Sequence, residues 1–306
     1  MPLTQLNFQP GIDTENTPTG AEGKWIDCDK VRFRKGLPQK IGGWIKFSPE
    51  YYVGVGRSLE QWFALTGTRF EALGTDRKVY AYSAGTSQDI TPIRETAALV
   101  NAISTTTSSN IITITDTTHG ADVGDFVTLS SVNTAVAGIP AATLDAEYEI
   151  LSISNVDAYT IQSSATANAN TGPTANCTVN YQLNIGPSEQ TFGYGWGSGT
   201  WNAGTWGTAR TASQITLDAR LWSINNWGED LIITQKDGGT YEWDTSAGMT
   251  DNRATAIANA PTQSSLSIIS TETRHVVCMG TETTIGTPAT QDKMFIRWSD
   301  QENYNQ

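Results

Sequence analysis

The sequence is poor in charge and in reactive side chains. Asp, Glu, Lys and Arg make up 16% of its 306 residues, against about 25% in typical soluble domains. This scarcity excludes coiled coils and long solvated helices, which consist mainly of Ala, Glu, Lys, Leu and Arg. Its three cysteines, Cys28, Cys177 and Cys278, are far apart and form no C-x-x-C pair. They are typical of a reducing compartment and predict neither a disulfide framework nor a zinc site.

Long apolar runs and catalytic motifs are missing as well. No membrane-spanning helix is expected, and the first residues lack the basic and apolar regions of a signal peptide. Nucleophile-elbow, zinc-protease and phosphate-loop patterns are absent. The only histidines, His119 and His275, border a turn and an apolar run, where structural roles are expected. The sequence therefore predicts no enzyme activity, no cofactor and no metal site.

What the chain has in quantity is Gly, Thr and aromatic residues, with 28 Gly, 10 Trp, 10 Tyr and 8 Phe. So many large aromatic side chains must be buried somewhere, which excludes a strongly charged disordered chain. Thr and aromatic residues favour strands, and glycines favour the turns between them. The composition predicts an all-β protein.

A unit of three short strands recurs along the chain. Copies are expected over residues 61–82, 220–243 and 275–299, and the first two are each followed by Ser-Ala-Gly. Repeated meanders of this kind are typical of β-propeller blades, although a β-sandwich of similar hairpins is an alternative. A closed propeller needs roughly four to eight blades, so three copies predict a propeller-type body that is incomplete.

Residues 97–186 differ from the rest of the chain. They contain almost no Lys or Arg and no Trp, yet apolar residues alternate over 110–115, 125–129, 147–153 and 159–161. This alternation predicts an inserted small β-barrel or β-sandwich rather than a disordered linker. The expected domains are 1–96, an N-terminal arm with the first blade or blades; 97–186, the insert; and 187–306, a Gly/Trp loop with further blades.

One short basic segment stands out from an acidic chain. The net charge is −12, but Lys24 to Lys46 contains seven basic and two acidic residues, which leaves −17 on the rest. A broad basic surface for nucleic acid is excluded. Lys30, Arg32 and Arg34 alternate with Val31 and Phe33, the period of a half-buried strand. The segment predicts a contact between subunits or a local phosphate contact, with a solvated hairpin face as the alternative.

A second unusual segment repeats tryptophan between glycines. Trp196, Trp201 and Trp206 recur every five residues. The spacing predicts a projecting loop whose aromatic rings bind a partner or line an opening. The alternative is a loop folded back with its rings on the body. If the rings bind sugars, the protein is a carbohydrate-binding module.

A third segment is a near match to a known motif. Residues 234–243 resemble the Asp-box of sialidase propellers, but with the wrong spacing, and an Asp-Gly-Gly turn between strands explains them without chemistry. A glycan-cleaving propeller would need two carboxylates at a pocket. The nearby acids that could serve are Asp237, Asp244 and Asp251.

Three N-terminal stretches carry a family resemblance. They read FQPGIDTENT over 8–17, AEGKWIDCDKVRFR over 21–34 and GLPQKIGGW over 36–44. Together they resemble the start of the tail-hub or nozzle proteins of short-tailed bacteriophages, also called packaged-DNA stabilisation proteins. The Gly/Trp loop and the final IRWSDQEN at 296–303 are similar to the same family.

The resemblance implies a structural virion protein of the phage tail, assembled in the host cytoplasm. It implies a six-fold ring of propeller subunits below the portal and adaptor, which retains packaged DNA and lets it pass at ejection. The expected partners are further copies of the chain, adaptor or portal-side proteins, tail fibres or spikes, and DNA held without sequence specificity. A phage propeller that binds or cleaves host-surface glycans is the alternative. The candidate contact residues are Trp25, Lys30, Arg32, Arg34, Trp44, Trp196, Trp201 and Trp206.

Overall fold

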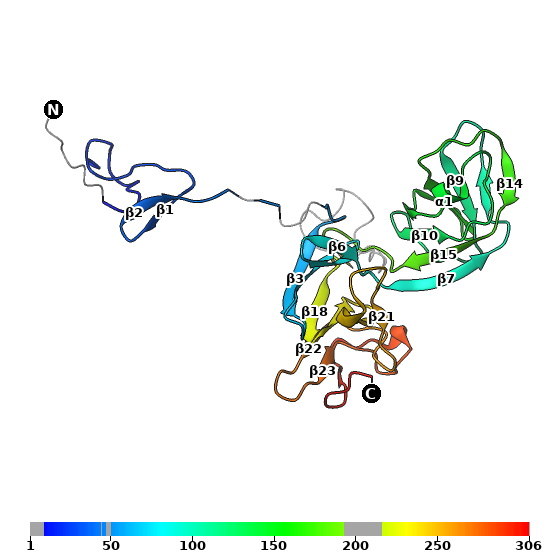
Figure 1. Cartoon of the computed structure of the whole chain (residues 1–306). Coiled ribbons are helices and arrows are strands. Elements are labelled where there is room, and N and C mark those ends of the chain that lie inside the picture. The colour runs from blue at the N-terminus through cyan, green and yellow to red at the C-terminus, as the bar shows by residue number, and fades with distance from the viewer. Residues whose placement is uncertain (1–8, 44, 47–49, 193–215, 306) are drawn as a thin grey trace, which may run out of the picture. The chain divides into compact units, whose positions relative to one another are not determined.

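The computed structural model describes residues 9–43, 45–46, 50–192 and 216–305 (Figure 1). Strands dominate these residues, which confirms the all-β prediction. The helical elements among them are one turn each: α1 (Ala141–Leu144), η2 (Thr245–Ala247) and η3 (Pro288–Thr290). The chain divides into two compact units, residues 1–47 and 48–306.

The N-terminal unit contains one hairpin, β1 (Val31–Arg34) and β2 (Leu37–Lys40). Its two-residue turn has positive φ at both Lys35 (50°) and Gly36 (79°), the geometry of a type I′ turn that suits the twist of paired strands. Pro38 is part of β2 and pairs with Phe33.

The larger unit contains three antiparallel sheets in which each strand pairs with the next along the chain. The first sheet has strands β3 (Gly56–Phe63), β4 (Arg69–Thr75), β5 (Val79–Ser83) and β6 (Thr86–Asp89). The second has β18 (Trp222–Trp227), β19 (Asp230–Gln235), β20 (Thr240–Trp243) and β21 (Thr255–Ala256). The third has β22 (Leu266–Ile269), β23 (Val276–Met279) and β24 (Ile296–Trp298).

These three sheets are stacked in chain order. β18 contacts β3 on one side and β22 on the other, as Figure 1 shows in blue, yellow and orange. Between the first two sheets, Trp62 packs edge-on against Trp243 with ring centroids 6.0 Å apart, and Phe70 stacks on Trp62 at 5.5 Å. A smaller core of Trp227, Ile232, Ile257, Val276 and Cys278 joins the second sheet to the third.

The order of strands in each sheet is that of a propeller blade, and none of the described sheets closes into a ring. The prediction of several small sheets in the body is therefore confirmed, and their identity as propeller blades stays a prediction. Within these three sheets, β6, β21 and β22 have no counterpart among the predicted strands. β16 (Thr191–Phe192) pairs with β17 (Thr216–Leu217) ahead of the second sheet.

The insert is a sandwich of two antiparallel sheets. One contains β11 (Glu147–Glu149), β10 (Phe126–Ser130), β15 (Cys177–Gln182) and β7 (Ile93–Leu99). The other contains β12 (Ser152–Asn155), β13 (Ala158–Gln162), β9 (Ile111–Thr115), β8 (Ile103–Thr105) and β14 (Thr171–Thr174). Side chains from both sheets form one core, among them the fully buried Ile112, Tyr159 and Val179.

Two sequence expectations about the insert differ from the structure in detail. The single strand expected over 147–153 is two strands, since the chain passes from one sheet to the other at the buried Ile150. The boundary expected between residues 96 and 97 falls inside β7, which pairs with β15 on both sides of it.

Candidate functional site

The basic residues of the N-terminal unit lie on a β-hairpin whose two faces differ. Val31 and Phe33 are half-buried, whereas Arg32 and Arg34 are exposed. The register places Gln39 opposite Arg32, and its side-chain oxygen accepts a hydrogen bond of 3.0 Å from Arg32 Nε. Arg34 makes no ion pair or hydrogen bond within the described part of the chain. One face of the hairpin therefore presents two guanidinium groups to solvent.

The opposite face of the hairpin packs against the preceding loop. The ring of Trp25 lies 6.4 Å from that of Phe33, and Trp25 bridges Ile12 in the backbone. Beside this bridge, Asp13 Oδ2 accepts hydrogen bonds from Lys24 Nζ at 2.7 Å and Asn16 Nδ2 at 2.9 Å. The Lys24 hydrogen bond and then the Asn16 side chain hold the pKa of Asp13 well below its ordinary value. Trp25 and Asp13 thus order the loop that supports the basic strand.

The N-terminal unit buries little apolar surface of its own. Among its described residues, Ala21 is the one buried apolar side chain. Ile12, Ile26, Leu37, Ile41 and Ile45 are all exposed. Exposed large apolar side chains next to charged ones are typical of a surface that another molecule covers.

The eight candidate residues are therefore only partly brought together. Trp25, Arg32 and Arg34 belong to the one hairpin and its supporting loop. Lys30 precedes β1 with φ of 55° and lies 3.7 Å from the carboxylate of Asp29, both side chains being exposed. Trp44, Trp196, Trp201 and Trp206 lie outside the described residues, so the predictions made on them stay predictions.

Sequence reasoning missed a group of charges at the contact between the insert and the body, which we call the junction cluster: Lys78, Asp89, Glu147, Gln182 and Arg253. Lys78 Nζ lies 2.8 Å from Asp89 Oδ2 and also pairs with Glu147 at the start of β11. Arg253 Nη1 lies 3.2 Å from Asp89 Oδ1, and its Nη2 lies 3.5 Å from Glu147 Oε2. Gln182 donates through Nε2 to both carboxylates.

The junction cluster is largely shielded from solvent. The Lys78 side chain is only 4% exposed, and its ammonium lies 4.1 Å from the ring centroid of Phe126. Burial by itself raises the pKa of Asp89, but Arg253 and Lys78 outweigh burial, so the pKa is lowered below its ordinary value. One signal for this cluster was present in the sequence. Because the insert has almost no Lys or Arg, any ion pair made by its acids must involve a basic residue of the body.

The three acids considered for glycan cleavage have local structural roles or none. Asp237 Oδ1 accepts hydrogen bonds from Ser265 Oγ at 3.0 Å and Gln291 Nε2 at 2.9 Å, and it pairs with Lys293. Asp244 caps η2 by accepting from the backbone nitrogens of Ser246 and Ala247. Asp251 is exposed in a turn with φ of 52°.

The pKa values of these acids do not suit a general acid. Burial raises the pKa of Asp237, but the hydrogen bonds from Lys293, Gln291 and Ser265 lower it by more, so the pKa lies below its ordinary value. The hydrogen bond from Ser246 lowers that of Asp244. A glycosidase needs one carboxyl with a raised pKa to protonate the leaving group. Neither of these two carboxyls provides it.

An apolar cavity of about 480 Å³ lies beside the edge strand β24 of the third sheet, lined by Ile257, Cys278, Trp298 and Tyr304 among others. The hydroxyl of Tyr304 pairs with Glu242, and burial, then Glu242, raises its pKa. Burial also raises the pKa of the Cys278 thiol, which makes it a poor nucleophile. The cavity offers space for an apolar side chain rather than a set of reacting groups.

The described residues contain no cluster of three or more His, Cys, Asp or Glu side chains arranged to hold a metal ion. No helix among them has the length and hydrophobicity to cross a membrane.

Comparison with known proteins gives little to add. No protein-family model matches the chain, and no curated protein matches it. Among solved structures, the chain is similar to the phage phi92 endosialidase, with 12% identity and a TM-score of 0.26 over 80% of this chain. The match spans about 38% of the endosialidase chain. A likeness this weak supports no conclusion about function.

Proposed function

We propose that this protein is a structural subunit of a phage tail hub or nozzle, forming with its copies a ring through which packaged DNA is retained and later ejected. The observation that carries the proposal is the N-terminal unit. It bears the sequence stretches that resemble this family, it exposes Arg32 and Arg34 on one face, and it has almost no core of its own.

The charge distribution supports a docking role for this unit. The segment Lys24 to Lys46 carries a net +5, and the rest of the chain −17. Opposite charges on two surfaces of one chain favour association between copies and raise its rate. The exposed Leu37 and Ile41 next to the arginines would provide the apolar part of the same contact.

The negative charge of the chain outside Lys24 to Lys46 supports a role as a channel through which DNA passes. DNA binds proteins largely through cations that release counterions from its phosphates. A channel that must let DNA pass should therefore have few cations on its wall, and the −17 of the remaining chain agrees with this requirement. The virion location, the portal, adaptor and fibre contacts and the six-fold symmetry belong to the same proposal.

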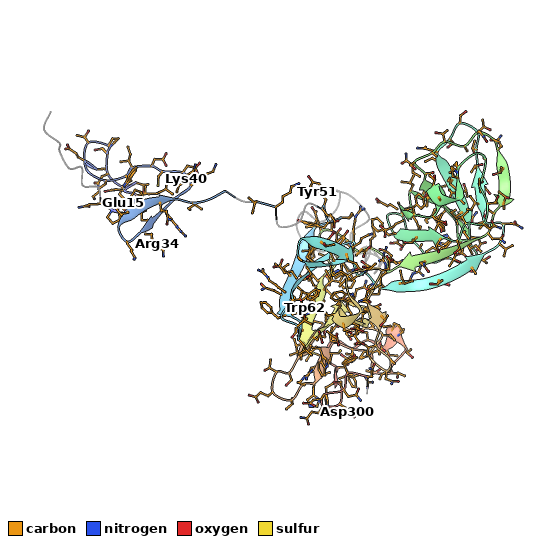
Figure 2. The ribbon with its side chains drawn as sticks, in the orientation of Figure 1. Glu15, Arg34, Lys40, Tyr51, Trp62 and Asp300 are labelled. Atoms are coloured by element: carbon orange, nitrogen blue, oxygen red, sulfur yellow. The ribbon has the colours of Figure 1, made fainter. Side chains whose placement is uncertain are left out.

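A charge reversal tests the docking role of the hairpin. Arg32→Glu combined with Arg34→Glu should reduce ring assembly and DNA retention, because both guanidinium groups lie on the face proposed to meet an acidic neighbour. Lys35→Glu with Lys40→Glu is the matched control: it makes the same charge change, at the turn and on the opposite face, where Lys40 pairs with Val31. Figure 2 shows Arg34 and Lys40 on opposite sides of the hairpin. Normal particles from the arginine variant would contradict the proposal.

A further inference from the structure

The stacked sheets of the body have faces that can be compared position by position. For each sheet, we call the side toward the sheet before it in the chain the preceding face, and the other side the following face. The following face of the first sheet, with Trp62 and Phe70, packs against the preceding face of the second, with Trp222 and Ile224. The second and third sheets meet in the same way.

The preceding faces of the first and second sheets match in register. In both sheets a cross-strand row of three residues runs over the first, second and third strands. The matched rows are Leu59, Leu73 and Tyr80 in the first sheet and Ile224, Ile233 and Tyr241 in the second. In the second sheet this row is seated on the first sheet. In the first sheet, Leu59 is 71% exposed.

The first sheet thus offers an open surface of the kind that stacks in this protein. Its third strand is covered, since the backbone nitrogen of Val53 donates to Tyr80 Oη at 3.0 Å. Its first strand is not: Phe63, on the same side as Leu59, is 59% exposed. The open part of the preceding face is therefore β3 with the adjoining Leu73.

The third sheet offers the opposite surface. Ser267 and Cys278 point toward the second sheet, where Ser267 Oγ accepts a hydrogen bond of 2.8 Å from Thr234 Oγ1. The residues that alternate with them form two apolar rows on the following face: Leu266, Met279 and Ile296, and Ile268, Val277 and Trp298. Ile296 is 50% exposed and Trp298 69%. Val277 and Met279 in these rows are half-buried, and Ile296 and Trp298 border the cavity beside β24.

We propose that the following face of the third sheet binds the preceding face of the first sheet in a second copy of the chain. The first sheet of the neighbour then stands where a fourth sheet of the same stack would stand. A second copy fits because the chain's own interfaces show a following face seated against a preceding face. Among the described residues, the two exposed faces of this pair lie on the two outer sheets of the stack.

Such a contact uses two different surfaces and is therefore head to tail, so copies close into a ring when the rotation between them allows it. The inference rests on the proposed function, because both require copies of the chain to associate. It assigns that association to sheet faces rather than to the basic hairpin. It adds the surfaces through which the bodies of neighbouring subunits meet.

Two substitutions on the full chain test the contact. Trp298→Asp places a carboxylate on the following face of the third sheet, and Leu59→Asp on the preceding face of the first. Each should weaken self-association by roughly tenfold or more, the scale of losing a central apolar anchor, as measured by sedimentation velocity. Val156→Asp in the insert is the control, since Val156 is also an exposed apolar residue and lies on neither face. Circular dichroism and thermal unfolding establish that all three variants fold.

Mixing the variants distinguishes the pairing. A head-to-tail contact predicts that Trp298→Asp and Leu59→Asp associate more tightly when mixed than either variant does alone, because the mixture restores one intact pair of faces. If Leu59→Asp alone associates as tightly as the wild-type chain, the preceding face of the first sheet takes no part in the contact and the proposal is wrong. A wild-type chain that stays monomeric overturns it as well.

The failures of the two proposals are distinguishable. A particle ring that assembles normally from Trp298→Asp overturns the sheet contact and leaves the tail function standing. If the two variants associate when mixed but the chain is absent from tail particles, the tail function is wrong and the sheet contact stands.

Discussion

At the scale of single residues, the most deeply buried cation among the ion pairs of the described residues, Lys78, lies in the contact between insert and body. Lys78 is nearly fully buried, and two carboxylates and the ring of Phe126 surround its ammonium. Removing one member of a buried ionic group leaves the others without compensation, which costs more than the group itself contributes. The junction cluster is therefore the place where a single charge removal should be most harmful.

Lys78→Met should lower the free energy of unfolding by about 3 kcal/mol, since among the described residues Arg253 would be the one ion-pair partner left to Asp89 and Glu147. Urea unfolding followed by circular dichroism measures the change. Lys236→Met is the control, because its pair with Asp218 is more exposed and should contribute about 1 kcal/mol or less. Equal losses for the two variants would show that burial of Lys78 is without consequence.

The pKa of Asp89 predicts the response of the same cluster to acid. A carboxyl whose pKa is lower in the folded state stabilises the fold above its unfolded pKa, and this stabilisation is lost as pH falls through the folded value. Burial raises the pKa of Asp89, but Arg253 and Lys78 bring it below 3.8. Stability should therefore decrease as pH falls below about 4.

Asp89→Asn isolates this effect, because the amide has the shape of the acid but does not titrate. The variant should be less stable than wild type near neutrality, and its stability should change less between mildly and strongly acidic buffer. Urea titrations at a series of pH values measure both. Parallel curves for variant and wild type would rule out Asp89 as the titrating group.

At the scale of elements, alternating apolar residues were what made strands recognisable in the sequence. The strands around Trp62, Ile233 and Tyr159 could be predicted because apolar and polar residues alternate in them or because apolar residues follow one another. β6 reads Thr-Ser-Gln-Asp and carries no apolar residue, so no pattern could identify it. β21 has two residues. Their positions are fixed by pairing to a neighbouring strand, which is a tertiary effect.

The candidate site was predictable to a similar extent. The alternation of Arg32 and Arg34 with Val31 and Phe33 was visible in the sequence and is present in β1. The junction cluster was not, because Lys78 and Glu147 are 69 residues apart in the sequence and meet only through the fold. The exposed faces of the outer sheets depend in the same way on which strands pair.

Close packing between the first two sheets makes one glycine necessary. A Cβ added to Gly74 in β4 would lie 2.8 Å from Cδ1 of Trp222, whose Nε1 donates a hydrogen bond of 2.6 Å to the Thr75 carbonyl. Gly74→Ala should therefore displace the indole and cost about 1–3 kcal/mol, as overpacked cores do.

Tryptophan fluorescence and urea unfolding measure this effect. Gly172→Ala in β14 is the matched control, since its Cβ would meet no atom within 4 Å. If both alanine variants unfold at the wild-type urea concentration, the two sheets are not packed closely at Trp222.

At the scale of the whole molecule, the chain combines a small basic unit with a large acidic one that ends in open apolar faces. Neither the exposed isoleucines of residues 9–46 nor Trp298 and Leu59 are covered by described parts of the chain. These features are typical of a protein whose native state is an assembly. The proposed ring accounts for both, with the hairpin and the outer sheets as two separate contacts between subunits.

Electron microscopy of assembled phage particles tests the central claim most directly. The proposal predicts density for this chain as a six-fold ring below the portal and adaptor, with the hairpin of residues 31–40 against a neighbouring subunit. Particles that lack the chain should lose their packaged DNA. The proposal is contradicted if the chain is absent from the tail, or if it stands there as isolated copies that release soluble sugars from a host-surface polysaccharide.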